Sequence, residues 1–144
     1  MRQPAQQRRQ RAAGRAGEFP PVPDPLPVPV ADSHTHLDIT VSEAGTPGGP
    51  AGDPVAAAIQ IAAEVGVDRL VQVGVDVASS RWGVEVARQH PAVVATVALH
   101  PNEAPRLADL DEALRVIETL SGDDRVRGIG ETGLDFFRTG EDGR

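Results

Sequence analysis

Residues 70–99 read LVQVGVDVASSRWGVEVARQHPAVVATVAL, in which two Val-rich apolar runs flank a stretch with helical spacing of its apolar residues. The apolar runs, residues 70–75 and 93–99, predict buried strands, because β-branched side chains favour strands. Residues 79–89 between them predict a helix. A strand, a helix and a strand in this order form a right-handed βαβ unit, so the two strands are expected to run parallel.

The same alternation continues on both sides of this unit. Further strands are predicted at residues 28–32 and 126–130. One helix is predicted to begin at Asp53-Pro54, an N-cap followed by proline at the first helical position, and another to cover 106–120. The helical side chains expected to face the core are Val55, Ile59, Ala62, Ala63, Trp82, Val86, Leu107, Leu110, Leu114 and Ile117. Four strands alternating with helices predict an α/β fold with a parallel sheet.

The amino-terminal segment has a different composition from the rest of the chain. Residues 1–30 hold seven of the 13 prolines and five Arg against two acidic residues. Closely spaced prolines favour an extended polyproline II conformation and do not pack into a core. Residues 1–27 are therefore expected to form a disordered Arg/Pro-rich extension, and residues 28–144 a folded domain.

Composition excludes several classes of protein. The 144-residue chain has no cysteine, which excludes disulfides, cysteine-ligated metal sites and a cysteine nucleophile, and favours a cytoplasmic location. No apolar run is long enough to span a membrane. Residues 31–144 hold nine Arg against 19 acidic residues, so broad electrostatic adhesion to nucleic acid is not expected. A phosphodiester substrate remains possible, because bound cations can supply local positive charge.

The first predicted strand leads into Asp32-Ser33-His34-Thr35-His36-Leu37-Asp38. Side chains two residues apart in an extended chain point the same way, so His34 and His36 can present two imidazoles to one cation. The alternative is a pair of hydrogen-bonded surface or cap histidines. Asp32 is expected to orient an imidazole, to approach the metal from below, or to bond the local backbone.

Other polar residues follow the remaining strands, and ligands of parallel sheets bind beyond the carboxyl ends of the strands. Glu131 can join the histidines as a ligand that bridges two cations, or can be a loop or capping acid. His100 can bond a phosphate or a water molecule, or be a buried, satisfied histidine. Arg138 can contact phosphate or be a solvated charge. Asp76 is expected to cap the following helix.

Three ordered stretches resemble the motifs of TatD-type metal-dependent deoxyribonucleases: DSHTHLD at 32–38, VALHPNEAP at 97–105 and GIGETGLDFFR at 128–138. The resemblance covers residues 28–144. It implies the amino-terminal half of a TIM-type (β/α)8 barrel, about the first four βα units. It further implies hydrolysis of DNA phosphodiester bonds with two divalent cations, Mg, Mn or Zn.

Carried over by motif, the resemblance makes His34 and His36 ligands of the first cation and Glu131 a bridge between both cations. It places His100 and Arg138 near the substrate phosphate. A complete barrel needs about 250 residues, so the remaining ligands and the catalytic Asp are expected beyond the end of this sequence. Open sheet edges are expected to permit association with another chain.

Two alternatives to a deoxyribonuclease stay open from the sequence. The chain can be a truncated, catalytically inactive fragment of such an enzyme. It can also belong to a different metal-dependent, amidohydrolase-like barrel that acts on amides or lactones, because such enzymes share a His-x-His pair after the first strand.

Overall fold

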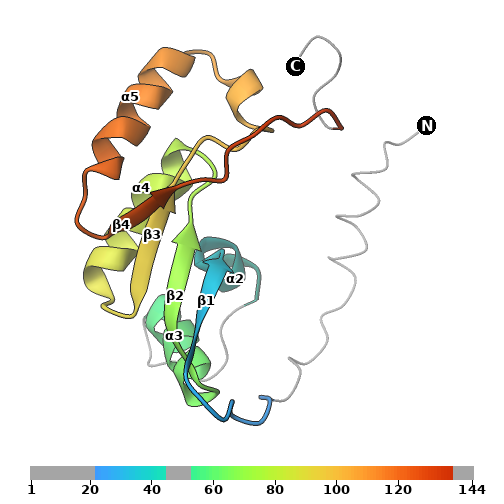
Figure 1. Ribbon diagram of the computed structural model, residues 1–144, viewed down its shortest axis with the longest axis vertical. Coiled ribbons are helices and arrows are strands. Elements are labelled where there is room, and N and C mark those ends of the chain that lie inside the picture. The colour runs from blue at the N-terminus through green and yellow to red at the C-terminus, as the bar shows by residue number, and fades with distance from the viewer. Residues whose placement is uncertain (1–21, 45–52, 138–144) are drawn as a thin grey trace.

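A computed structural model describes residues 22–44 and 53–137, and the described part contains a four-stranded parallel sheet (Figure 1). The strands are adjacent in chain order: β1 (Val30–Thr35), β2 (Val67–Val73), β3 (Val93–Val97) and β4 (Val126–Ile129). The helices are α2 (Leu37–Ala44), α3 (Pro54–Glu64), α4 (Val77–Gln89) and α5 (Leu110–Ser121), with a short 3-10 turn η1 (Ala104–Arg106) before α5. The chain thus has the predicted α/β fold, a partial TIM-type barrel.

The hydrophobic core lies between the sheet and the helices packed on it. Figure 1 shows α4 and α5 against the same side of the sheet, where α4 contacts β3 and α5 contacts both β3 and β4. Every second residue of β3 points into this layer and is fully buried. The core residues of β3 and α4 are Val93, Ala95, Val97, Val84, Val86 and Ala87. Their burial follows the period-2 pattern of the strand and the helical pattern of α4.

The amino-terminal end of α4 is fixed by a capping box, as predicted for Asp76. The Asp76 carboxylate accepts the backbone N–H of Ser79 at 2.6 Å, while Ser79 Oγ accepts the backbone N–H of Asp76 at 3.1 Å. The helix approaches the end of β2 closely. A Cβ at Gly74 would lie 2.4 Å from Ser80 Oγ, so this position admits only glycine without a shift of the helix.

Two predictions about helix faces were wrong. Leu110 and Leu114 are 43% and 50% exposed, and α5 instead buries Ala113 and Ile117. The stripe that meets the sheet contains Ala113 and Ile117, and Leu114 lies about 100° around the helix axis from Ala113. Helix α5 begins at Leu110, four residues after the predicted start, and Asp109 caps it by accepting the Glu112 backbone N–H at 2.9 Å. The predicted inward position of Ala63 was also wrong, because Ala63 is exposed.

Strand limits shifted by a few residues. The first strand begins at Val30 and runs to Thr35, so His34 lies inside the strand. The second strand covers 67–73, and the third ends at 97. The Asp53 cap was confirmed, since its Oδ1 accepts the N–H groups of the first turn of α3.

Residues 1–21 of the predicted extension lie outside the described residues, and the predicted domain boundary at residue 28 stays a prediction. The described residues just before β1 contact the end of α3: Leu26 donates its backbone N–H to the carbonyl of Val65, the C-cap of α3, at 3.0 Å. None of the helices within 22–44 and 53–137 is long and apolar enough to cross a membrane.

An arginine–aspartate network fixes the start of β4. Arg125 donates from its side chain to the backbone carbonyls of Ala87, Pro91 and Val93. Asp123 accepts the Arg125 backbone N–H at 2.8 Å and the Arg88 guanidinium at 2.6 Å. These two contacts hold the pKa of Asp123 below its ordinary value, with the Arg125 N–H as the larger cause.

The substitution Asp123→Asn tests this network. Because the pKa of Asp123 is lower in the folded chain, its carboxylate stabilises the fold above the ordinary carboxyl pKa of about 4, and this contribution disappears as pH falls through the folded value. We expect the free energy of unfolding of the variant to be about 1 kcal/mol lower than that of the original chain at pH 7. Urea unfolding at pH 7 and pH 3 checks this, and an equal difference at both pH values would contradict it.

Candidate metal centre

Two histidines stand at the carboxyl end of β1. His34 lies in the strand and His36 directly follows it, and their Nε2 atoms are 3.2 Å apart. Two nitrogens that each lie about 2.1 Å from one cation are separated by about 3.4 Å at the tetrahedral angle, so the observed spacing fits a shared cation. Asp32 Oδ1 accepts the backbone N–H of His34 at 3.0 Å, which is the bond to the local backbone that was one of the alternatives for this residue.

The backbone around the histidine pair is held by its neighbours. Between the two histidines, Thr35 Oγ1 donates to the Val71 carbonyl of β2 at 3.0 Å. The His36 carbonyl accepts both the backbone N–H and the Oγ1 of Thr40, each at 3.0 Å. These bonds fix the end of β1 against β2 and against the first turn of α2.

Glu131 reaches the histidines from the opposite edge of the sheet. Its Oε1 lies 3.5 Å from His34 Nε2. Strands lie about 4.8 Å apart, so β1 and β4 would be roughly 14 Å apart in a flat four-stranded sheet. His34 and Glu131 thus meet although they come from the two edge strands of the described sheet.

Gly130, the residue before Glu131, forms hydrogen bonds to β3 through both its backbone N–H and its carbonyl. Gly130 donates its N–H to the Val97 carbonyl at 3.2 Å, and Thr96 Oγ1 donates to the Gly130 carbonyl at 3.2 Å. These two bonds continue the β3–β4 pairing beyond the last residue of β4. They set the point from which the Glu131 side chain leaves the backbone.

His100 follows β3 and lies beside Glu131. Its backbone N–H donates to the Val75 carbonyl at 2.7 Å, and its Nδ1 accepts the Asn102 backbone N–H at 3.1 Å. Because Nδ1 is an acceptor, the neutral ring carries its proton on Nε2, which faces Glu131 Oε2 at 3.6 Å. His100 is thus arranged as a hydrogen-bond donor at Nε2.

The chemistry of the donor set fits a divalent cation. One ligand atom from each of His34, His36 and Glu131 lies within 4.8 Å of the others, and these three form the candidate group found among the described residues. Imidazole nitrogen together with carboxylate oxygen suits Zn²⁺, Mn²⁺ and similar ions. The His34 and Glu131 side chains are 51% and 38% exposed, so a cation and a substrate can reach them from solvent.

The structure brings the predicted residues His34, His36 and Glu131 close together, and their role as metal ligands stays a prediction. The sequence analysis did not single out one neighbour. Gln72 of β2 is fully buried, and its amide bonds the turn that follows His36. An amide side chain inside the apolar run Leu70–Val73 was the available signal, because buried polar groups need specific partners. Arg138 lies outside the described residues, and its role stays a prediction.

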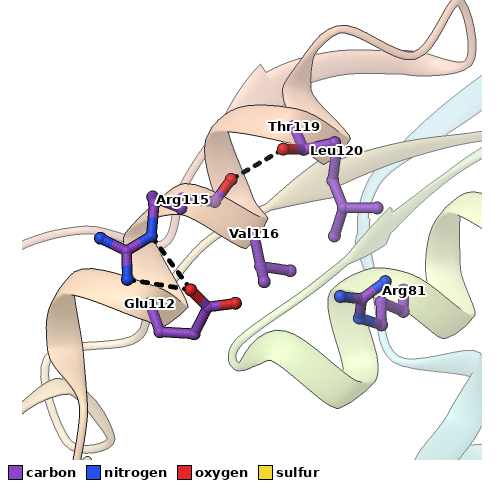
Figure 2. Close-up of a pocket in the computed structure, with 6 residues that line it drawn as sticks. All are labelled: Arg81, Glu112, Arg115, Val116, Thr119 and Leu120. Atoms are coloured by element: carbon purple, nitrogen blue, oxygen red, sulfur yellow. Dashed lines mark hydrogen bonds and ion pairs between the residues drawn. The ribbon is translucent and has the colours of Figure 1, made fainter.

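A separate cavity lies between α4 and α5, with a volume of about 210 Å³ (Figure 2). Val116 and Leu120 line it from α5, and Arg81 faces it from α4. The α5 residue Arg115 is already paired with Glu112 at 2.9 Å. None of the strand-end residues lines this cavity, so it is distinct from the candidate metal centre.

Comparison with known proteins agrees with the motifs at the strand ends. The model of the family described as "TatD related DNase" matches residues 31–144. A Mycobacterium tuberculosis (strain ATCC 25618 / H37Rv) protein described as "Uncharacterized metal-dependent hydrolase TatD" is 37% identical over 111 residues. That alignment covers 77% of this chain and 39% of the relative, so the chain spans about two fifths of the relative's length.

The family match includes every residue of the candidate metal centre. It also includes all four described strands except the first residue of β1. The fold, the strand-end residues and both comparisons thus lead to the same assignment: the chain belongs to the TatD-related DNase family.

Proposed function

We propose that the protein is a metal-dependent hydrolase that cleaves phosphodiester bonds of DNA. The observation that carries this proposal is the cluster of two imidazoles and one carboxylate, within 4.8 Å, at the carboxyl ends of a parallel sheet. Family membership supports it, because the matching family is described as DNases and the similar mycobacterial protein as a metal-dependent hydrolase.

In this proposal His34, His36 and Glu131 would hold a divalent cation. The second Glu131 oxygen, which lies 3.6 Å from His100 Nε2, would serve a second cation of the expected pair, Mg, Mn or Zn. When bound, such cations lower the pKa of a water molecule and neutralise charge on phosphate oxygens. The acidic balance of residues 31–144 agrees with this arrangement, since positive charge is needed only at the reacting phosphate.

His100 is proposed to orient the substrate. Its Nε2–H is directed at the edge of the cluster, 3.6 Å from Glu131 Oε2, and can donate to a phosphate oxygen that lies beside that carboxylate. Arg138 is proposed to contact the same phosphate, following the family motif that ends at this residue.

Metal binding provides the first test. We expect His36→Ala to lower the affinity for Zn²⁺ by more than about 100-fold, because losing a direct ligand exceeds the effect of losing an outer hydrogen-bond partner. His90→Ala is the matched control, since His90 lies at the end of α4 and faces Asp53 rather than the cluster. Titration against a chelating dye measures both variants, and equal losses in the two would contradict the assignment of His36.

Hydrolysis provides the second test. With Mn²⁺ or Mg²⁺, we expect release of nucleotides from linear DNA by a protein that holds this chain together with the further ligands and the catalytic Asp that the family resemblance implies. In that protein Glu131→Gln should reduce the rate at least about 100-fold. The Gln side chain keeps the shape of Glu131 but removes the charge that holds the cation. The initial rate of acid-soluble nucleotide release measures the effect.

The competing functions give different results in the same assay. Cleavage of an amide or lactone substrate with no cleavage of DNA would replace the proposal with an amidohydrolase-like activity. Stoichiometric metal binding with no hydrolysis of any of these substrates would identify the 144-residue chain as an inactive fragment. A rate that is unchanged in Glu131→Gln would overturn the role given to that carboxylate.

A further inference from the structure

Gln72 is a fully buried polar side chain on β2, and its amide is directed at the first turn of α2. Its Oε1 accepts the Leu37 backbone N–H at 2.7 Å, and its Nε2 donates to Asp38 Oδ1 at 3.1 Å. Both atoms of the amide therefore bond the two residues that immediately follow His36. We propose that Gln72 is a positioning residue that sets the placement of His36 for cation binding.

The peptide bond after His36 is held on both of its polar atoms. Gln72 binds its N–H, which belongs to Leu37, while Thr40 binds its carbonyl oxygen through two donors. Fixing this peptide plane restricts the backbone rotation ψ of His36, and so restricts where its imidazole can reach. The first N–H groups of a helix have no partner within the helix, so Gln72 also satisfies a group that α2 leaves open.

Packing alone does not explain an amide at this position. The neighbouring buried residues of β2, Leu70 and Val73, are apolar, and burying an amide is costly unless its atoms are hydrogen-bonded. Helix α4 also makes room for it: a Cβ at Gly83 would lie only 3.1 Å from Gln72 Cγ. Helix α4 thus leaves space for the Gln72 side chain, and α2 supplies the partners of its amide.

The inference rests on the proposed metal site but concerns a different residue. Gln72 bonds neither imidazole in the structure, and it acts through the backbone and through Asp38. Its loss should therefore weaken cation binding without removing any direct ligand. The loss of cation affinity should be larger than in a variant elsewhere in the core that loses the same free energy of unfolding.

The first variant is Gln72→Met, which keeps the length of the side chain and removes both hydrogen bonds to the turn. We expect its Zn²⁺ affinity to fall about tenfold, the lower range for loss of an outer partner of a metal ligand. Val86→Ala is the matched core control, because Val86 lies near the carboxyl end of α4, away from the metal centre. The control should lose thermal stability and keep its Zn²⁺ affinity within about twofold.

A rescue experiment separates positioning from packing. Gln72→Glu alone places a carboxylate against that of Asp38 and should weaken both folding and Zn²⁺ binding. Adding Asp38→Asn restores a donor–acceptor pair, since the new carboxylate can accept from the Leu37 N–H and from the asparagine amide. We expect the double variant to recover at least half of the lost Zn²⁺ affinity, measured as the logarithm of Kd.

Hydrogen exchange tests the same bond in the metal-free chain. The Leu37 amide should exchange at least about tenfold faster in Gln72→Met than in the original chain, and at an unchanged rate in Val86→Ala. Accelerated exchange with unchanged Zn²⁺ affinity would overturn the positioning role, as would equal affinity losses in Gln72→Met and Val86→Ala. If the original chain binds no Zn²⁺, the metal proposal fails, whereas the exchange rates still report the bond between Gln72 and Leu37.

Discussion

The candidate metal centre depends on hydrogen bonds from the two central strands, β2 and β3. These bonds hold residues at or just after the carboxyl ends of the edge strands, β1 and β4. From β2, the Val71 carbonyl holds Thr35 and the Gln72 amide holds Leu37, one on each side of His36. From β3, Val97 and Thr96 hold the backbone of Gly130, next to Glu131. The proposed ligands come from opposite edges of the sheet and must meet at one point. A shift of the backbone at the end of either edge strand would therefore move His36 away from Glu131.

This constraint connects the fold to the proposed chemistry. Parallel strands bring their carboxyl ends to the same edge of the sheet, and the helices occupy the connections between strands, so polar residues can gather there without disturbing the core. Most residues of the core belong to β3 and α4, and Leu37, which follows His36 in the chain, is part of the same core. Under the proposed function, bound cations would supply positive charge where an acidic chain meets a polyanionic substrate.

The sequence predicted the features that depend on local pattern. Alternating strands and helices, the caps Asp53 and Asp76, and the strand-end positions of His34, His36 and Glu131 all follow from spacing along the chain. The exposed face of α5 did not, because the contacts with the sheet decide which of its apolar residues are buried, and these contacts are not local. The contacts of Gln72 and Gly130 join segments more than 30 residues apart, and no periodicity of the sequence predicts such partners.

X-ray absorption spectroscopy of the Zn²⁺-loaded chain tests the central claim most directly, because it counts the ligands that surround the ion. If His34 and His36 hold one ion as proposed, the spectrum shows two imidazoles at about 2.0 Å together with carboxylate or water oxygen. It loses one imidazole in His34→Ala and keeps both in His90→Ala. A spectrum with oxygen ligands alone, or with imidazole scattering that does not change in His34→Ala, would contradict the account.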